Sequence, residues 1–258
     1  MGIIISMANQ KGGVGKTTTA INLAASLAVA EKKCLLVDCD PQGNATTGLG
    51  FDKSILKHGL YEFLLGPAME AEVIQESALA GLNLIGATND LIGAEVEMVD
   101  IEEREFCLAK KLGPLKNKFD YILLDCPPSL GFMTVNALTA SDSVLVPLQC
   151  EYYALEGLSQ LLKTVQAVKK RLNPALKLGG ILLTMYDSRN NLSIQVEQEV
   201  RGHFKETVWE TVIPRNVRLS EAPSHGKPIL LYDINSKGAQ AYLGLARELI
   251  GRGGENHG

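Results

Sequence analysis

Long apolar runs and paired cysteines are both missing from this sequence. The first apolar run, Ile3 to Ala8, is far too short to span a bilayer and no basic segment precedes it, so we expect neither a transmembrane helix nor a secretory signal. The five cysteines are odd in number and include no CxxC pair. This pattern argues against a disulfide framework and predicts reduced thiols in a cytoplasmic protein.

An excess of positive charge is missing as well. The 258 residues include 25 lysines and arginines against 29 aspartates and glutamates, so the formal net charge is −4. No bulk positive field therefore draws the whole protein to nucleic acid, and any DNA contact has to be a local patch. Repeats, linkers and low-complexity tracts are also absent from the sequence. A chain of this length and composition predicts one domain with one large core.

Short runs rich in Ile, Leu and Val alternate with longer amphipathic stretches, which is typical of a mostly parallel sheet covered by helices on both faces. The predicted strands are Ile3 to Ala8, Cys34 to Asp38, Leu82 to Ile85, Tyr121 to Asp125, Ser143 to Pro147, Leu178 to Thr184 and Val208 to Ile213. The predicted helices are Thr17 to Ala30, Arg104 to Leu115, Phe132 to Ala140, Leu155 to Leu172, Ile194 to Phe204 and Lys237 to Ile250, with short helices in GLYEFLLG and EAEVIQES. We expect one α/β domain over residues 1–250 and a flexible tail over 251–258, because GRGGENHG can bury little surface.

The strongest motif is the glycine-rich segment NQKGGVGKTT, residues 9–18, which lies between the first predicted strand and an Ala-rich amphipathic helix. Glycines let such a loop curl until its N–H groups point at phosphate oxygens, and the positive end of the following helix faces the same anions. Lys16 then reaches the β- and γ-phosphates, and Thr17 offers its hydroxyl to Mg²⁺. A turn that served packing alone would need neither the Lys-Thr pair nor the closely spaced glycines.

This loop also departs from the usual GxxxxGK[ST] pattern, because Gln10 stands where the first glycine is expected and Lys11 follows it. Further segments of interest are VDCDPQGNATTGLG, ILLDCPPS, VPLQCEYYALEGLSQL, TMYDSRNNL and IPRNVRLSEAPSHGKPI. Together they resemble the ParA/MinD family of deviant Walker-A ATPases, most closely its chromosomal ParA (Soj) branch. The resemblance covers nearly the whole chain and implies a P-loop NTPase fold with ATP and Mg²⁺ as ligands.

The resemblance assigns roles at the phosphates. The phosphate-binding residues it implies are Lys11, Gly12, Gly13, Val14, Gly15, Lys16, Thr17 and Thr18. Lys11 is expected to cross to the second subunit of a homodimer that encloses ATP, much as an arginine finger does; otherwise it is an ordinary solvated loop lysine.

The resemblance also assigns roles to three aspartates. Asp38 and Asp125 end predicted strands, where ligands of α/β sheets gather; with Thr17 they are expected to serve Mg²⁺, Asp125 through water. Asp40 is expected to position the attacking water, which makes Lys11, Lys16 and Asp40 the predicted catalytic set. A purely structural strand-end carboxylate remains the alternative for Asp38 and Asp40.

The later part of the chain is assigned by resemblance alone. Thr184, Pro214, Arg215 and Asn216 match positions around adenine in relatives. Arg189 and Arg218, with Lys227 beside them, match a face that binds double-stranded DNA without reading its sequence. Composition by itself would not suggest this face, because residues 189–227 carry acidic residues in similar number. Residues 40–47 and 125–132 resemble the switch regions.

The resemblance further implies an ATP-bound DNA-partition ATPase that hydrolyses slowly until a ParB-type centromere-binding protein stimulates it. Such a protein is cytoplasmic, associated with the nucleoid and independent of membranes. A MinD-like membrane protein is one alternative, but LARELIGRGGENHG ends in glycines and lacks a basic amphipathic helix. A P-loop metabolic synthetase is another, and it would carry further substrate-binding regions. Cys107 and Cys126 show no iron–sulfur spacing, and the sequence leaves chromosomal or plasmid cargo open.

Overall fold

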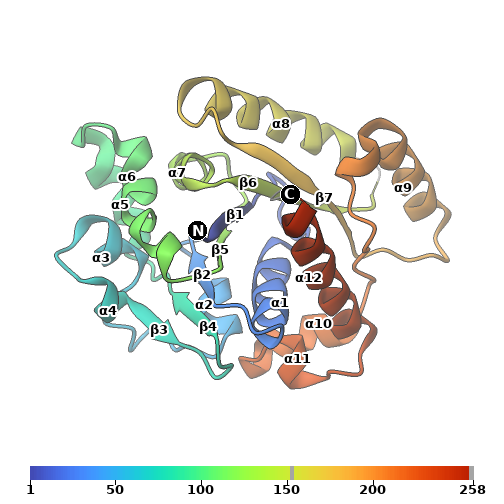
Figure 1. Cartoon of the computed structure of the whole chain (residues 1–258), viewed down its shortest axis with the longest axis horizontal. Helices are drawn as coiled ribbons and strands as arrows, with labels where there is room; N and C mark the ends of the chain where they lie inside the picture. The colour runs from blue at the N-terminus through green and yellow to red at the C-terminus, as the bar shows by residue number, and fades with distance from the viewer. Residues whose placement is uncertain (152–153, 256–258) are drawn as a thin grey trace.

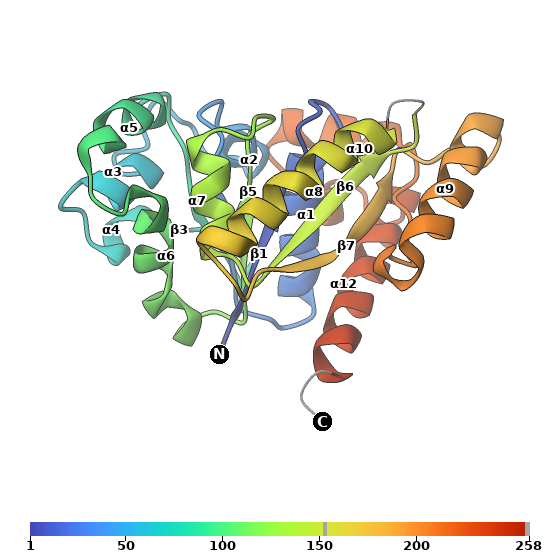
Figure 2. The same ribbon diagram turned by 90° about the horizontal axis from the view of Figure 1, so that it is seen from above.

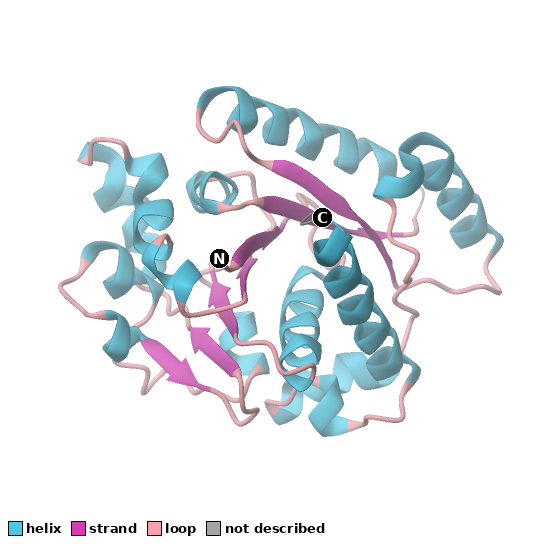
Figure 3. Cartoon of the chain, in the orientation of Figure 1, coloured by secondary structure: helices cyan, strands magenta, loops and turns pink. Residues whose placement is uncertain are grey.

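The computed structural model describes residues 1–151 and 154–255, without the side chains of Glu95 and of residues 253–255. The two tyrosines of the segment VPLQCEYYALEGLSQL and residues 256–258 lie outside the described residues. The centre is a seven-stranded sheet in the order β3-β4-β2-β5-β1-β6-β7 (Figures 1 and 3). Its strands are β1 (Ile3–Met7), β2 (Cys34–Asp38), β3 (Ile74–Glu76), β4 (Leu82–Ile85), β5 (Tyr121–Asp125), β6 (Ser143–Gln149) and β7 (Lys177–Thr184).

Neighbouring strands are parallel except for β3, which pairs with β4 in the antiparallel direction. The helices are α1 (Lys16–Val29), α2 (Asn44–Gly48), α3 (Leu60–Leu65), α4 (Glu70–Val73), α5 (Leu91–Glu97), α6 (Cys107–Leu112), α7 (Phe132–Ala140), α8 (Ala154–Arg171), α9 (Asn191–Phe204), α10 (Val217–Glu221), α11 (Ile229–Tyr232) and α12 (Lys237–Glu255). Short 3₁₀ helices cover Met98–Asp100, Arg104–Phe106, Pro114–Asn117, Lys205–Thr207 and Ala222–His225. The predicted α/β class, a mostly parallel sheet between helices, is confirmed.

Strand β5 shows how the core forms on both faces of the sheet. Ile122 and Leu124 belong to one apolar cluster, whereas Tyr121 and Leu123 belong to another, because successive side chains of a strand point to opposite sides. Helices α1 and α12 lie side by side over one face, and α7 and α8 cover the other (Figure 1). Helices therefore cover both faces of the sheet, and the functional groups are expected where the strands end.

Strand predictions succeeded where a short apolar run is buried in the middle of the sheet. The observed bounds of β2, β4 and β5 are those predicted. The predicted strand Val208 to Ile213 is wrong, since residues there form no continuous ladder with β7: there is an isolated bridge at Val208, and the Trp209 and Ile213 amides donate to β7 at 2.9 and 2.8 Å. The amides of Glu210 and Thr211 donate instead to the Glu248 carboxylate of α12, at 2.9 and 3.0 Å, so the ladder cannot continue.

Two helix predictions also fail in part. The predicted helix Arg104 to Leu115 is broken into α6 and two 3₁₀ helices. Pro114 follows the end of α6 directly after Gly113, and proline has no N–H to continue a helix and clashes with the preceding turn. EAEVIQES is a single turn, α4, followed by β3, because Ile74 pairs with Ile85 and covers the otherwise open edge of β4.

The last helix continues past its predicted end. Helix α12 runs to Glu255, whereas the prediction ended it at Ile250. The flexibility of residues 251–258 stays a prediction, and part of that tail lies outside the described residues. Within the residues that the structure describes, no helix is long and apolar enough to cross a membrane.

Candidate functional site

The glycine-rich loop joins β1 to α1 at the edge where the parallel strands end. Gly13 and Gly15 have φ values of +74° and +88°, in the left-handed region where a side chain would be strained. Thr184 at the end of β7 donates its hydroxyl to the Val14 carbonyl at 2.8 Å, and the Asn9 amide donates to the Pro147 carbonyl at 2.8 Å. The loop is therefore held from the neighbouring strands β7 and β6.

Lys16 lies inside this loop. Its side chain is buried, and its ammonium donates to the Lys11 carbonyl at 3.0 Å. Burial lowers the pKa of Lys16, while the nearby Asp125, Cys126 and Asp40 act in the opposite direction. The lysine thus occupies the hollow of the loop, where it is placed to meet an anionic ligand.

Two carboxylates lie side by side beneath the loop. Asp38 and Asp125 are partners in the register of β2 and β5, and both are fully buried. Asp38 accepts hydrogen bonds from the Thr46 amide at 2.8 Å and the Thr46 hydroxyl at 2.7 Å. Burial raises the pKa of Asp38, although these hydrogen bonds oppose the rise.

Asp125 differs because neither of its oxygens has a hydrogen-bond partner among the described residues. Burial and the adjacent Asp38 raise the pKa of Asp125 well above its ordinary value; the Thr17 hydroxyl lies near enough to oppose the rise, but not in the geometry of a hydrogen bond. A buried carboxylate without a partner is costly unless a cation or its bound water satisfies it. The Asp125, Asp38 and Thr17 oxygens are the hard donors that Mg²⁺ prefers, so the residues fit this ion.

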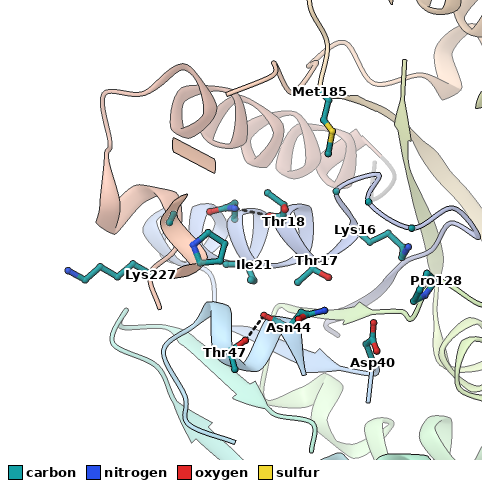
Figure 4. A pocket seen from close by; sticks show the side chains of 16 residues that line it. Lys16, Thr17, Thr18, Ile21, Asp40, Asn44, Thr47, Pro128, Met185 and Lys227 are labelled. Atoms are coloured by element: carbon teal, nitrogen blue, oxygen red, sulfur yellow. Dashed lines mark hydrogen bonds between the residues drawn. The ribbon is translucent and has the colours of Figure 1, made fainter. Parts of the chain in front are cut away.

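Lys16 and Thr17, which lie close to Asp125, line a cavity of about 410 Å³ (Figure 4). Neither Asp38 nor Asp125 is among the residues of its wall. The predicted residues in its wall are Gly12, Gly13, Gly15, Lys16, Thr17, Thr18, Asp40 and Lys227. In Figure 4 the side chains of Lys16, Thr17 and Asp40 face the same hollow, and Asp40 approaches from the side opposite α1. The structure thus brings the predicted phosphate-loop and water-positioning residues together in one space.

The four residues predicted around adenine also share one wall. Thr184, Pro214, Arg215 and Asn216 line a second cavity of about 460 Å³, together with Gly15 of the phosphate loop. Because Gly15 lines both cavities, a ligand with phosphates in the first can extend its base into the second. Their combined size suits a nucleotide, since small-molecule sites usually enclose several hundred Å³.

Lys11 points to a partner within its own chain. Its ammonium lies 2.6 Å from a carboxylate oxygen of Glu151, just after β6. Both side chains are partly exposed, at 39% and 48%. Lys11 and the buried Val14 therefore do not line the nucleotide cavity, unlike the other predicted residues of the loop.

The residues predicted to bind DNA are exposed, and the two arginines among them form ion pairs within the chain. Arg189 is 88% exposed, and its guanidinium donates twice to Asp187, at 2.9 and 2.8 Å. These hydrogen bonds lower the pKa of Asp187 to about 2. Arg218 contacts Glu221 at 2.9 Å and Asp233 at 3.5 Å, whereas the ammonium of Lys227 points away from the phosphate loop (Figure 4).

Several residues of the site were missed from the sequence. Glu151 holds Lys11, and Thr46 links Asp38 to the amide of Ala87 at 2.9 Å. Met185 lines both cavities with a left-handed φ of +50°, which is unusual for this residue type. Thr46 could have been suspected from the sequence, because it lies in the segment VDCDPQGNATTGLG that the resemblance includes.

Known proteins resemble this chain over nearly its full length. A family model described as an AAA domain matches residues 2–178. The chromosome partitioning protein ParA of Myxococcus xanthus (strain DK1622) is 60% identical over 252 residues, 98% of this chain and 89% of that protein. The sporulation initiation inhibitor protein Soj of Bacillus subtilis (strain 168) is 57% identical over 253 residues, 98% of this chain and 100% of that protein.

Solved structures resemble the fold as well. Cobyrinic acid a,c-diamide synthase from Mycobacterium smegmatis, with bound ADP and magnesium, has a TM-score of 0.85 at 39% identity, covering 97% of this chain and 94% of that chain. The septum site-determining protein MinD from Pyrococcus horikoshii OT3, complexed with Mg-ADP, has a TM-score of 0.81 at 28% identity, covering 96% of each chain. Both similar proteins hold a nucleotide with magnesium.

Proposed function

Because the chain belongs to the ParA/MinD family of ATPases, we propose that it is a chromosome-partitioning ATPase that binds ATP with Mg²⁺ and hydrolyses it to ADP and phosphate. The observation that carries this proposal is the cavity in which the phosphate loop, Lys16, Thr17 and Asp40 meet, with the buried Asp125, beside Asp38, close to Lys16 and Thr17. Lys16 and the loop amides bind the phosphates. Bound Mg²⁺ would neutralise phosphate charge from a site formed by Thr17, Asp38 and Asp125.

Asp40 is the residue that we assign to the attacking water. It lies at the cavity wall with an exposed fraction of 8%, and one of its oxygens accepts from the Gln42 amide at 2.9 Å. This contact fixes the carboxylate toward the cavity and leaves its other oxygen to orient water. Thr184, Pro214, Arg215 and Asn216 hold the adenine in the second cavity.

We further propose that the active form is a homodimer completed by Lys11. The ammonium of Lys11 lies outside its own nucleotide cavity, where an exposed ion pair with Glu151 holds it. A cation so placed can be supplied to the phosphates of a second molecule, which makes dimerisation depend on ATP. The Lys11–Glu151 contact then breaks when the dimer forms.

The proposed dimer binds double-stranded DNA through Arg189 and Arg218, with Lys227 nearby, and associates with the nucleoid in the cytoplasm. A ParB-type protein stimulates hydrolysis and releases it. These arginines contact phosphates, so binding is independent of base sequence. Both arginines are exposed, and ion pairs at the surface are weak enough for DNA to replace the carboxylates of Asp187 and Glu221.

A second candidate is an ATP-dependent amide-forming synthase, which the likeness to the cobyrinic acid a,c-diamide synthase favours. The two partition proteins are 60% and 57% identical, against 39% for the synthase, and this difference supports partition. The candidates also differ in behaviour. A partition ATPase gains DNA affinity with ATP, whereas a synthase consumes ATP only with a carboxylic acid acceptor.

The test is DNA binding by the Asp40→Ala variant in the presence of Mg²⁺ with ATP or ADP. We expect a dimer by light scattering and retarded DNA with ATP alone, because the variant keeps the groups that bind ATP but lacks the one that positions water. Glu199→Ala, at an exposed position of α9, is the control and should release its DNA as ATP is consumed. A monomeric Asp40→Ala, or retardation that ignores the nucleotide, would contradict the proposal.

A further inference from the structure

A separate cavity of about 510 Å³ lies at the end of the sheet where the parallel strands begin. Lys33, which precedes β2, stands in its wall with Ile3 and Tyr121, the first residues of β1 and β5. The same three strands end at the phosphate loop, Asp38 and Asp125. A five-residue strand, roughly 16 Å long, therefore separates this cavity from the nucleotide site. Figure 2 shows the N-terminus and the end of α12 on this side of the molecule, and α5 and α10 on the other.

The wall of this cavity is positively charged, although the whole chain is acidic. Its charged residues are Lys32, Lys33, Lys116, Lys118 and Asp120. Their net charge is 4 − 1 = +3, whereas the whole chain has a net charge of −4. We call this space, with its four lysines, the lysine cavity. A local excess of one sign around a concave surface attracts ligands of the opposite sign.

Two of the four lysines are available to a ligand. The ammonium groups of Lys32 and Lys33 form no hydrogen bond or ion pair with any residue that the structure describes. Asp120 accepts from the backbone amide of Lys33 at 2.8 Å rather than from an ammonium group. Lys116 and Lys118 do pair with carboxylates, but these carboxylates belong to residues outside the wall. The positive charge of the lysine cavity is therefore only partly neutralised by the chain itself.

Backbone hydrogen bonds tie the segments of the lysine cavity together. The amide of Gly2 donates to the Lys116 carbonyl at 2.7 Å, and the amide of Asp120 donates to the Lys33 carbonyl at 2.8 Å. Gly2 leaves no room for a side chain, because a Cβ atom there would lie 2.0 Å from the carbonyl oxygen of Phe119. The backbone that carries the lysines is thus fixed in advance, which lowers the entropic cost of binding a ligand.

Tyr121 adds an uncharged donor to the same wall. The residue is only 7% exposed, and its hydroxyl forms no hydrogen bond with the part of the chain that the structure describes. Burial raises the pKa of Tyr121, so the hydroxyl stays protonated and can donate to an anion. Because buried polar groups are normally hydrogen-bonded, this hydroxyl favours a ligand oxygen beside it. Ile3, Phe119 and Ile250 are partly buried and supply apolar surface in the wall.

We propose that the lysine cavity binds a small phosphorylated molecule, whose phosphate oxygens contact Lys32, Lys33 and the Tyr121 hydroxyl. Lysine ammonium groups are compact charges that suit phosphates. A terminal phosphate carries roughly 1.5–2 negative charges at pH 7, so a ligand with two phosphates matches the charge of the wall. The apolar residues accept a ring or an alkyl group attached to the phosphates. The volume is that of a small-molecule site, whereas a nucleic-acid duplex would reach only the rim.

The test is a calorimetric titration of the full chain with inorganic pyrophosphate, while ADP and Mg²⁺ fill the nucleotide site. We expect Lys32→Ala combined with Lys33→Ala to weaken binding at least about tenfold, because two charge-assisted hydrogen bonds are lost. Tyr121→Phe keeps the ring and should weaken binding about threefold. The matched control is Lys169→Ala combined with Lys170→Ala, which removes two adjacent exposed lysines of α8 outside the cavity. It should bind as the unaltered protein does.

Other probes identify the class of ligand. Phenyl phosphate should bind more tightly than inorganic phosphate, because its ring covers the apolar part of the wall. An equal loss of pyrophosphate binding in both double lysine variants, or no loss in either, overturns the proposal, since the lysines then act only as diffuse surface charge. A single-stranded oligonucleotide, and phosphatidylcholine vesicles with phosphatidic acid, cover the other occupants. If one of these binds through Lys32 and Lys33 while pyrophosphate does not, the ligand is a nucleic acid or a membrane and the small-molecule proposal fails.

ADP separates the lysine cavity from the nucleotide site. Without ADP the phosphate loop offers pyrophosphate another site, so the number bound per chain should fall from about two to about one when ADP and Mg²⁺ are added. Complete loss of pyrophosphate binding on adding ADP would show that the loop is its only site and would overturn the proposal. The proposal does not rest on the ATPase function. Failure of ADP to bind would count against that function alone, while the Lys32, Lys33 and Tyr121 variants would still report on the lysine cavity.

Discussion

Lys11 and Lys16 belong to one loop but have different surroundings. Lys16 is buried and donates to a carbonyl within the loop, whereas Lys11 extends to Glu151 in a partly exposed ion pair. Exposed pairs of this kind contribute about 0–1 kcal/mol. Lys11 can therefore leave Glu151 at small cost to the fold, and it is the more mobile of the two charges.

The two lysines should separate in a mutational test. Lys16→Ala should lose ATP binding, because it removes the cation inside the cavity. Lys11→Ala should bind ATP but hydrolyse it at least about a hundredfold more slowly, since the transition state lacks the cation from the second molecule. Binding of a fluorescent ATP analogue and release of phosphate are the measurements.

Lys110→Ala is the matched control for the Lys11 variant. Lys110 also forms an exposed ion pair, with Glu103 at 2.7 Å, but it lies on α6 away from the cavity. Its variant should keep both binding and basal turnover. Normal partner-stimulated turnover by Lys11→Ala would show that no lysine is exchanged between subunits.

At the scale of elements, the contact between α12 and residues 208–213 depends on Glu248. Burial alone would raise the pKa of Glu248, but the amides of Thr211 and Glu210 and the charge of Arg252 outweigh it and lower the pKa. Because the pKa is lower in the folded state, this contribution is present above the unfolded value of about 4.3 and is lost as the pH falls through the folded value.

Glu248→Gln should therefore lower the free energy of unfolding by roughly 1–3 kcal/mol at pH 7, since one of the two amides loses its acceptor. The difference from the unaltered protein should shrink toward pH 3. Trp209, the single tryptophan, is buried next to these amides and reports unfolding by its fluorescence. Glu199→Gln on α9 is the control, and a pH-independent difference would rule out ionisation of Glu248 as the cause.

How far the sequence predicts these elements depends on where their contacts come from. The bounds of strands β2, β4 and β5 were predicted to the residue, because their short apolar runs favour burial in a sheet without any particular contact from a distant segment. Residues 208–213 do not form the predicted strand, because Glu248 of a distant helix accepts from the amides of Glu210 and Thr211. The phosphate loop could likewise be predicted, because its motif lies in one continuous segment. The contact of Lys11 with Glu151 could not, because the two residues are 140 positions apart and no local pattern marks Glu151.

At the scale of the whole molecule, the proposed DNA binding has to work against a net charge of −4. Arg189→Glu or Arg218→Glu should weaken binding of the ATP-bound dimer to every duplex alike. Each lost phosphate contact should reduce the slope of log K against log salt by about 0.9, counted for both subunits. The measurement is a salt titration on unrelated duplexes, with Asp40→Ala as the background.

Lys170→Glu, at an exposed position near the end of α8, provides the same change of charge elsewhere. It should leave the salt slope nearly unchanged. If it lowers affinity as much as the arginine variants do, the effect is one of total charge, and the arginines form no specific DNA face.

The place of β1 in the sheet has a consequence for how the protein is made. Although β1 is made before the other six strands of the sheet, it lies between β5 and β6, so both of its neighbours are missing until residues 121–149 have been synthesised. The hydrogen bond from Thr184 to Val14 spans 170 residues and forms later still. Pairings so distant in sequence make folding slow. A nascent chain therefore carries its phosphate loop without these supporting strands until β5, β6 and β7 have been made, and ATP can stabilise the protein only after that point.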